Sequence, residues 1–209
     1  MSKNEAPLQA LQSFLPPDSF DEVVQYLLDH KVHLTITRER KSVLGDYRNR
    51  FADKNHRISV NGNLNPYSFL ITLLHELAHL FTYEKFGHRV AAHGEEWKRE
   101  FGILLAAFIK KQIFPADITK ALLHSVHNPA ASSCADVQLT KVLRQYDPHK
   151  KGQVFIEELP NGACFKIEDG RVFRKESLLR KRYRCIEIKT GLTYLFSPVF
   201  EVIPIQQNS

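Results

Sequence analysis

The segment PYSFLITLLHELAHLFTYEKF, residues 66–86, constrains the fold more than any other part of the chain, because it is apolar on nearly every side of a helix. Asn65 can cap its first turn, Pro66 suits the first helical position, and Gly87 offers a C-terminal stop. A helix that is apolar all round has to be buried inside a domain. We therefore predict a central helix that other elements cover.

Two histidines and an acid interrupt this apolar helix in the pattern H-E-x-x-H, at His75, Glu76 and His79. Residues four apart lie on the same side of a helix, so both imidazoles can bind one ion, with Glu76 beside them. A metal ion would offset the cost of burying these polar groups. In zinc hydrolases with this spacing the metal acidifies a water molecule and the carboxylate removes its proton. We expect one catalytic zinc ion, with Glu76 as general base.

A catalytic zinc normally takes three protein ligands and a water molecule, so a third ligand is needed. The metzincin spacing would place a glycine and a histidine three and six residues after the second ligand. Those positions hold Thr82 and Lys85, so that spacing is excluded. A carboxylate from the following helix is an alternative, with Glu96 and Glu100 as candidates.

His93 is the better candidate for the third ligand. It precedes Gly94 at an expected helix start, and residues 80–92 allow the chain to turn back toward the first two histidines. His88 has a similar loop position but lies closer to the end of the first helix. The alternative for either residue is a solvated loop histidine.

Shorter elements are expected around the central helix. Ser19 and Glu22 form the S-x-x-E capping pattern ahead of an apolar run, which predicts a helix after the Pro-Pro break. Alternating β-branched residues and related patterns predict strands at residues 32–37, 43–48 and 57–60. Further helices are expected at residues 7–14, from shortly after Gly94 to Pro115, and at residues 116–126.

Beyond about residue 150 the helical period disappears. Three dipeptides that favour hairpin turns lie between strand-like runs: Asn161-Gly162, Asp169-Gly170 and Thr190-Gly191. We predict an antiparallel β module of four or five strands. Its expected core residues are aromatic, namely Phe155, Phe165, Phe173, Tyr183, Tyr194 and Phe196.

The length of 209 residues suits one ordinary domain, or one domain with a small appendage. A hydrophobic content of 43% is enough to fill a core and excludes disorder along the whole chain. We expect an α+β chain with a helical domain at residues 1–127 that includes a small antiparallel sheet. A linker at residues 128–150 and a small basic all-β module at residues 151–209 are expected to follow.

The run FLITLLHELAHLFTYEKFGHRVAAHGEEWKREF resembles the metallopeptidase domain of the SprT-like (Spartan-like) family, whose pattern is H-E-x-x-H, a loop and then H-G-x-x-F/W-K. The second half of this pattern is found here as His93, Gly94, Trp97 and Lys98. The upstream order is similar too, with a strand followed by Gly45 and Tyr47. The resemblance covers about residues 15–125.

The resemblance implies a zincin-like fold with His75, His79 and His93 as zinc ligands and Glu76 as catalytic base. Many members of the family carry a C-terminal zinc ribbon with four cysteines, and this chain departs from that pattern. Only two of its three cysteines lie in the β module, and none forms a C-x-x-C pair. We expect no second zinc there and no disulfide framework.

The N-terminal residues and the apolar stretches of the chain lead us to expect no membrane partner. The N-terminus lacks the apolar segment of a signal peptide, and the longest apolar stretch, residues 103–109, is too short to span a bilayer. Together with the cysteine content, this favours a cytoplasmic protein.

A basic segment, residues 171–189, contains eight cations and two acids, which leaves a charge of +6, as much as the whole chain. Phosphate contacts with DNA are one interpretation, with Tyr183 and Phe173 as stacking aromatics. A charged strand edge that prevents sheet-to-sheet pairing is the other. The resemblance favours DNA, because the best-known family members act on proteins attached to DNA. The candidate DNA-binding residues are Arg174, Lys175, Arg180, Lys181, Arg182 and Arg184.

We expect a zinc metallopeptidase that hydrolyses peptide bonds in a protein substrate, and the resemblance implies DNA-bound or DNA-crosslinked proteins. Tyr47 is a candidate oxyanion donor from sequence order. One alternative is a DNA-associated adaptor or transcription-related regulator with a silent zinc site, although the intact Glu76 argues against it. Another is a zinc hydrolase of a non-peptide substrate, which the ligands alone do not exclude.

Overall fold

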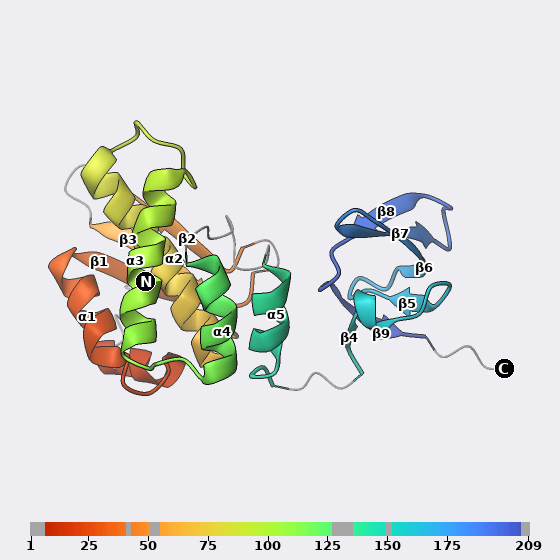
Figure 1. Ribbon diagram of the computed structural model, residues 1–209, viewed down its shortest axis with the longest axis horizontal. Coiled ribbons are helices and arrows are strands. Elements are labelled where there is room, and N and C mark those ends of the chain that lie inside the picture. Colours follow the sequence, from red (N-terminus) through yellow and green to blue (C-terminus); the bar gives the residue numbers. More distant parts are fainter. Residues whose placement is uncertain (1–6, 41–42, 51–54, 127–135, 149–151, 206–209) are drawn as a thin grey trace, which may run out of the picture. The chain divides into compact units, whose positions relative to one another are not determined.

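The computed structural model describes residues 7–40, 43–50, 55–126, 136–148 and 152–205 of the chain (Figure 1). Contacts between residues divide the chain into two compact units, Met1–Asp147 and Pro148–Ser209. The first unit combines helices with a three-stranded sheet, and the second is built on a six-stranded sheet. The predicted α+β class with an all-β C-terminal module is confirmed.

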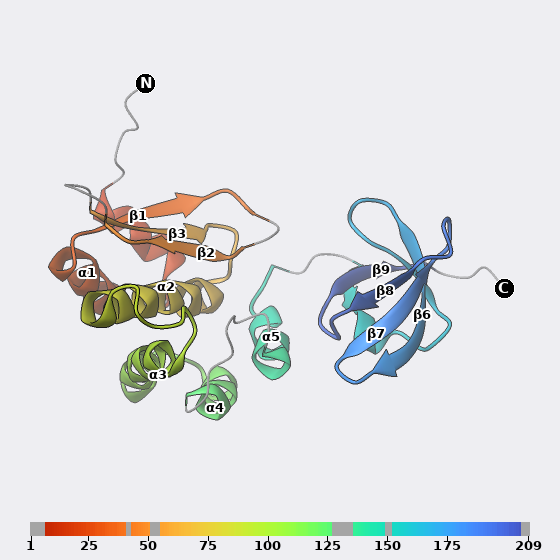
Figure 2. The ribbon, with the colours of Figure 1, turned by 90° about the horizontal axis from the view of Figure 1, so that it is seen from above.

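The N-terminal unit is built around helix α2. Its elements are η1 (Leu8–Phe14), α1 (Phe20–Asp29), β1 (Val32–Thr37), β2 (Gly45–Arg48), β3 (His56–Asn61), α2 (Pro66–Phe86), α3 (Glu95–Lys110), α4 (Ala116–Ser125) and α5 (Val137–Arg144). In Figure 2 the sheet lies on one side of α2, and α3 and α4 lie on the other. Helix α2 is therefore covered on both sides, which explains why it needs apolar residues on nearly all of its faces.

Both ends of α2 lie where the sequence predicts them. The side chain of Asn65 accepts a hydrogen bond of 2.9 Å from the backbone N–H of Ser68, and Pro66 begins the helix. Gly87 follows the last helical residue with a φ of 62°, a left-handed conformation that glycine adopts without strain. Local capping rules thus fix the position of this helix.

Asn65 also joins α2 to α5. Its side-chain amide donates to the backbone oxygen of Leu143 at 3.0 Å and to Oδ1 of Asp147 at 2.7 Å. This contact keeps α5 in the N-terminal unit, and the boundary between the two units follows Asp147 in the sequence. The range 128–150, suggested as a linker by the sequence, contains α5 of the N-terminal unit, and residues 127–135 lie outside the described residues.

Helix α1 is confirmed, but its expected capping box is not formed. The hydroxyl of Ser19 donates to the backbone oxygen of Pro16 at 2.7 Å and caps no helical N–H. The carboxylate of Glu22 accepts a hydrogen bond of 3.0 Å from the hydroxyl of Tyr26 and pairs with Lys111. The serine hydroxyl, which the S-x-x-E pattern assigns to the first turn of the helix, therefore bonds to the turn at the Pro-Pro sequence instead.

The N-terminal sheet has the strand order β1-β3-β2 and is mixed. Strand β1 pairs with β3 in parallel, whereas β2 pairs with β3 in antiparallel orientation. The expectation of an antiparallel sheet is therefore wrong for the β1–β3 pair. Because β3 inserts between two strands that run in opposite directions, it has to be parallel to one of them.

The C-terminal unit forms one sheet with the order β4-β9-β5-β6-β7-β8. Its elements are β4 (Val154–Phe155), η3 (Ile156–Glu158), β5 (Cys164–Lys166), β6 (Val172–Leu179), β7 (Arg182–Glu187), β8 (Thr193–Phe196) and β9 (Glu201–Pro204). The sequence predicts four or five strands. The structure has six, because the last described segment returns as β9 between β4 and β5.

Two of the three predicted hairpin turns join neighbouring strands. Asp169-Gly170 connects β5 to β6, and Thr190-Gly191 connects β7 to β8. Asn161-Gly162 forms no hairpin, because β9 separates β4 from β5. In the turn from β6 to β7, Arg180 has a φ of 53°. The sequence did not predict this turn, because it has no glycine at the left-handed position.

The core of the C-terminal unit is apolar and largely as predicted. It consists of Ile156, Phe165, Ile167, Phe173, Cys185, Phe196 and Val202, with Tyr183 and Tyr194 packed against it. Cys164 and Cys185 are free thiols, and Cys134 lies outside the described residues. Within the described ranges, no helix combines the length and apolar character needed to cross a membrane.

Candidate metal centre

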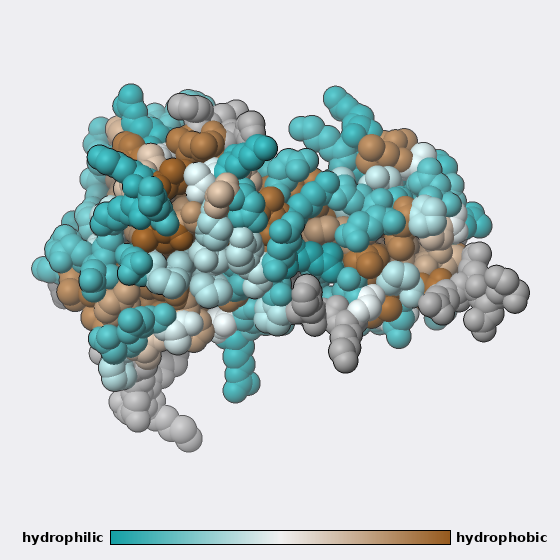
Figure 3. Space-filling model, turned by 60° about the horizontal axis from the view of Figure 1, so that its bottom comes forward, coloured by the Kyte–Doolittle hydropathy of each residue, from teal (hydrophilic) through white to brown (hydrophobic). Residues whose placement is uncertain are grey.

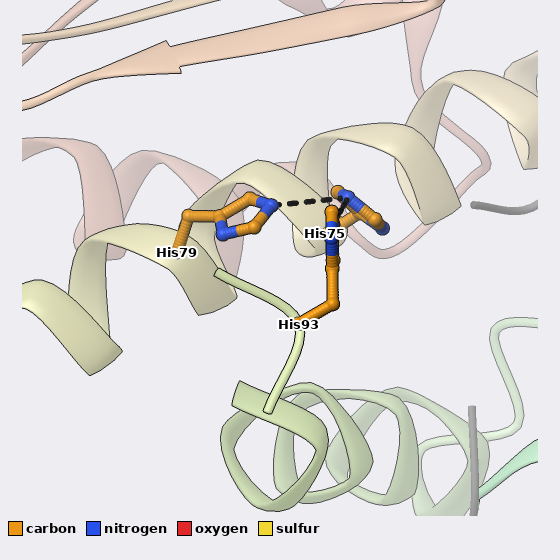
Figure 4. Close-up of side chains that lie close together, drawn as sticks. All are labelled: His75, His79 and His93. Carbon is orange, nitrogen blue, oxygen red and sulfur yellow. Dashed lines mark hydrogen bonds between the residues drawn. The ribbon is translucent and has the colours of Figure 1, made fainter. Parts of the chain in front are cut away.

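Three histidine side chains meet beside α2 (Figure 4). His75 and His79 lie one turn apart on this helix, and His93 comes from the loop just before α3. Nε2 of His75 lies 3.2 Å from Nε2 of His79 and 3.3 Å from Nε2 of His93. One potential ligand atom from each residue lies within 4.8 Å of the others. The structure therefore brings together the three histidines suggested by the sequence.

These distances fit a tetrahedral zinc site. Zinc–imidazole bonds of about 2.0–2.1 Å place two ligand nitrogens roughly 3.3–3.4 Å apart at a tetrahedral angle. The two distances from His75, 3.2 Å and 3.3 Å, are close to that value. A neutral imidazole has one N–H and one lone pair, so nitrogens that face one another are satisfied together when each gives its lone pair to a shared ion.

The other candidate ligands have different surroundings. Both carboxylate oxygens of Glu100 accept hydrogen bonds of 2.7 Å from Nζ of Lys85, and Glu96 lines a separate hollow beside α3. His88 lines the same cleft as the three histidines, but its ring packs on Tyr83 with a centroid distance of 5.1 Å. Within the described ranges, no further His, Cys, Asp or Glu joins the three histidines.

Trp97 packs beneath all three imidazoles. Its ring centroid lies 4.7 Å from those of His75 and His93 and 5.4 Å from that of His79. The indole N–H donates to the backbone oxygen of His75 at 3.4 Å, and the side chain is fully buried. This contact ties α3 to the ligand-bearing turn of α2. The sequence includes Trp97 in a family motif, but it does not reveal this supporting position.

Burial holds the imidazoles in the neutral form that binds metals. It lowers the pKa of His75 to about 3 and that of His79 to about 4, and the neighbouring imidazoles add to both changes. Burial also lowers the pKa of His93. Because a ligating histidine has to be unprotonated, the site is prepared for a cation near neutral pH.

Glu76 lies next to His75 on α2, where strand β2 passes very close to the helix. A Cβ atom at Gly45 would lie 2.5 Å from Oε1 of Glu76, so a side chain there would collide with the carboxylate. The backbone N–H of Tyr47 donates to this carboxylate. Burial raises the pKa of Glu76 to about 8, the charge of Asp46 adds to the rise, and Arg40 opposes it.

A cleft of about 470 Å³ opens over the three histidines and Glu76. Tyr47 of β2 also lines it, with its ring nearly parallel to that of His79 at a centroid distance of 6.4 Å. The structure therefore places the candidate oxyanion donor beside the site. The sequence gives no signal for the neighbour of this tyrosine, His56, whose Nδ1 lies 2.9 Å from the phenol oxygen.

Three of the candidate DNA-binding cations lie at the turn from β6 to β7. Arg180, Lys181 and Arg182 are exposed, and in the described part of the chain they form no ion pair. Leu178 and Leu179, which precede them on β6, are 50% and 46% exposed. Brown hydrophobic side chains lie among the teal hydrophilic ones on the C-terminal unit, at the right of Figure 3.

The other three candidates have partners inside the C-terminal unit. Arg174 and Arg184 pair with the two carboxylate oxygens of Glu176 at 3.0 Å and 3.6 Å. Lys175 is buried, because its side chain points to the core face of the sheet. Phe173 is also fully buried and offers no surface for stacking. The exposed basic surface is therefore smaller than the sequence suggests.

Comparison with known proteins gives one match. Residues 18–113 match the model of the SprT-like family. No curated protein and no solved structure matches the chain. The matched segment runs from α1 through α3 and contains the three histidines and Glu76, whereas the C-terminal unit lies outside it. This segment of the N-terminal unit is therefore similar to the SprT-like family.

Proposed function

We propose that the N-terminal unit is a zinc-dependent metallopeptidase, with His75, His79 and His93 as ligands and Glu76 as general base. The proposal rests on the buried carboxylate of Glu76, which lines the same cleft as three converging imidazoles. Structural zinc sites are closed by four protein ligands, whereas catalytic sites use three and keep one position open. Three histidines beside a cleft therefore favour a catalytic site over a silent one.

The residues around the cleft have separate tasks in this proposal. When bound, zinc supplies a Lewis acid that polarises the scissile carbonyl and lowers the pKa of a water molecule. Glu76 accepts a proton from the attacking water and passes it to the leaving amine. A cation near Glu76 favours its charged form and so offsets the rise in pKa that burial causes. Gly45 and the backbone N–H of Tyr47 hold the carboxylate in place.

Strand β2 supports a peptide as the substrate. It stands at one end of the strand order β1-β3-β2, and Gly45, Asp46 and Tyr47 from this strand line the cleft. An extended peptide can add to a sheet edge through main-chain hydrogen bonds. A peptide bound in this way would run along the strand that contacts Glu76.

The decisive experiment compares the zinc-loaded wild type with its Glu76→Gln variant. The probe is a small protein crosslinked to a single-stranded DNA oligonucleotide. We expect the variant to keep its zinc and to lose cleavage by about 10²–10⁴-fold, the usual contribution of a general base. Full activity in this variant would exclude the mechanism. If both proteins hold zinc and leave the probe intact, the adaptor with a silent zinc site is the better explanation.

A matched control is Glu95→Gln. Glu95 is an acid of α3 whose side chain is 87% exposed and pairs with Lys98 on the surface. This change removes one carboxylate without touching the cleft, so cleavage should remain at the wild-type rate. A loss comparable to that of Glu76→Gln would mean that the assay responds to charge and not to the base.

We further propose that the C-terminal unit binds DNA through the exposed cations at the β6–β7 turn, which would direct the peptidase to DNA-bound proteins. Arg180, Lys181 and Arg182 form a compact group of charges that phosphates can reach. The exposed Leu178 and Leu179 beside them can contact bases. Lys175 has no part in this surface, because its ammonium is buried.

Salt-dependent binding to a single-stranded DNA oligonucleotide tests this surface. The triple variant Arg180→Asn, Lys181→Gln and Arg182→Gln keeps a residue at position 180 that tolerates its left-handed backbone. We expect weaker binding at every sequence, and a slope of log affinity against log salt that is smaller by about 2. Lys110→Gln with Lys120→Gln, in the N-terminal unit, is the control. Equal slopes in the wild type and the triple variant would exclude the proposed surface.

A further inference from the structure

Tyr47 lines the cleft, and its hydroxyl contacts the buried side chain of His56. This histidine is the first residue of β3 and is 2% exposed. Its Nδ1 lies 2.9 Å from the hydroxyl of Tyr47, and the two rings are stacked with a centroid distance of 5.9 Å and an angle of 18°. The position of a cleft-lining hydroxyl therefore depends on a buried neighbour.

The surrounding groups determine which nitrogen of His56 carries the proton. The backbone N–H of Arg50 donates to Nδ1 at 3.3 Å, so Nδ1 is an acceptor and the proton lies on Nε2. Oε1 of Glu84 lies 3.8 Å from Nε2, beyond hydrogen-bond distance, and Nε2 has no hydrogen-bond partner among the described residues, while Oε2 of Glu84 lies 2.7 Å from Nδ1 of His30. Burial lowers the pKa of His56, which agrees with a neutral ring. In its contact with His56, Tyr47 is therefore the donor.

Nδ1 of His56 thus receives two donors on a single lone pair. One is the hydroxyl of Tyr47, and the other is the backbone N–H of Arg50. When the phenol turns its proton toward the cleft, the N–H of Arg50 continues to satisfy the buried Nδ1. The rotation leaves no buried acceptor without a partner, which is the main cost of breaking such a bond.

We propose that Tyr47 donates its hydroxyl hydrogen bond to the carbonyl oxygen of a peptide bound in the cleft, and that His56 is the positioning residue that holds this hydroxyl until the peptide accepts it. The inference rests on the proposed peptidase function. Negative charge grows on the carbonyl oxygen as water attacks, so the donor binds the transition state more strongly than the substrate. No covalent bond to either residue forms or breaks; the hydroxyl only changes its acceptor.

A double-mutant cycle on the zinc-loaded protein tests the coupling, with the DNA-crosslinked protein as the probe. Tyr47→Phe should lower kcat by about 10²-fold, as the loss of an oxyanion donor does, and change KM little. In His56→Gln the amide reaches the position of Nε2, so no atom remains at the position of Nδ1 to hold the hydroxyl of Tyr47. The donor is then less well placed, and kcat should fall by about tenfold. If His56 acts through Tyr47, the double variant should be no slower than Tyr47→Phe alone.

Two further variants serve as controls for the cycle. His56→Asn places an amide oxygen where Nδ1 lies and should recover most of the kcat that His56→Gln loses. Tyr26→Phe removes a hydroxyl of α1 that donates to Glu22, so its kcat should equal that of the wild type. Equal zinc content in all variants shows that the ligands are undisturbed. Effects that multiply in the double variant would overturn the coupling.

A second measurement uses the metal-free protein and does not depend on cleavage. The ¹³Cζ signal of Tyr47, identified by its absence in Tyr47→Phe, reports the hydrogen bond of the phenol. His56→Gln should shift this signal while that of Tyr26 stays in place, and His56→Asn should shift it less. An unchanged Tyr47 signal in both variants would overturn the positioning role.

The two measurements separate the failure of this inference from that of the proposed function. A zinc-loaded wild type that leaves the probe intact would refute the peptidase and the donor role of Tyr47 together. The ¹³C shift would then still decide whether His56 holds the phenol. A wild type that cleaves, with Tyr47→Phe equally active, would refute the donor role alone.

Discussion

A buried ammonium group in the C-terminal unit and a buried imidazole in the N-terminal unit have opposite surroundings. In the C-terminal unit the ammonium of Lys175 donates to the backbone oxygen of Leu159 at 2.5 Å and lies 3.9 Å from the centre of the Tyr183 ring. In the N-terminal unit Nε2 of His75 faces two other imidazole nitrogens. Buried polar groups in native cores have complementary partners. A buried group with internal partners thus contributes to folding, whereas a cluster of like groups indicates a ligand.

The largest effect is expected when one of the three clustered imidazoles is removed. His93→Ala leaves two imidazoles of the three, so we expect the protein to lose its stoichiometric zinc and its cleavage activity. Metal analysis after gel filtration measures the first effect. His88→Ala is the matched control, because this residue lines the same cleft but packs on Tyr83. Unchanged zinc content in His93→Ala would exclude it as a ligand.

A smaller but still large effect is expected at the contact between β2 and α2. Gly45→Ala places a methyl group 2.5 Å from Oε1 of Glu76 and so displaces the proposed general base. A misplacement of about 1 Å can cost 10²-fold in rate, so we expect a loss of this order in kcat with zinc retained. Gly62→Ala is the control, since its Cβ would meet Ile36 at 2.8 Å. Similar rates for both variants would mean that Gly45 serves only the packing of the strand.

The buried carboxyl should make the metal-free protein sensitive to pH. The pKa of Glu76 is raised from 4.5 to about 8, so between these values the folded chain keeps a proton that the unfolded chain releases. The contribution of Glu76 to stability therefore falls as pH rises through this window, by up to about 1.4 kcal/mol per unit of the pKa difference. Below about 6.5 the lowered pKa values of His75 and His79 act in the opposite direction, so the effect of Glu76 is measured as a difference between two proteins. Urea unfolding of the metal-free wild type and Glu76→Gln measures it. The stability difference between the two proteins should change with pH, and a constant difference would contradict the prediction.

The smallest effect should appear in the C-terminal unit. Lys175→Met keeps the length of the side chain but leaves the backbone oxygens of Leu159 and Glu157 without their donor. We expect the unit to lose about 1–3 kcal/mol of stability, the usual cost of an unsatisfied buried group. Hydrogen exchange in each unit measures the change, and zinc binding should stay the same. Lys166→Met, at an exposed position of β5, is the control. Equal protection in both variants would show that the internal partners of Lys175 add no stability.

The elements that the sequence predicted correctly follow local rules. Asn65, Pro66 and Gly87 fix the ends of α2 through capping and backbone preferences, and the spacing of His75 and His79 follows from the helical repeat. His93 required a loop to return to the helix, and the structure brings it 3.3 Å from His75. For the helix ends and the histidine pair, sequence signals were sufficient because neighbours in the chain determine the outcome. His93 was instead suggested by the length of the loop and by the resemblance to the family motif.

The errors arose where a partner outside the expected element took a group that a local pattern assigned elsewhere. The hydroxyl of Ser19 went to Pro16 and not to its helix. Insertion of β3 made the sheet mixed, which no strand signal reveals. Lys175 follows the exposed Arg174 in a basic segment, yet it points to the core face, where the backbone oxygen of Leu159 accepts its hydrogen bond.

The sequence alone determined the buried helix, the pair of imidazoles on one of its sides and the all-β character of the second unit. Only the tertiary structure decided that Trp97 packs on the three imidazoles, that Gly45 brings β2 against Glu76, and that His56 contacts the hydroxyl of Tyr47. The physical reason is that periodicity encodes which side of an element is apolar. Which atom a buried polar group meets depends on the element packed against it, and this is fixed only when the chain has folded.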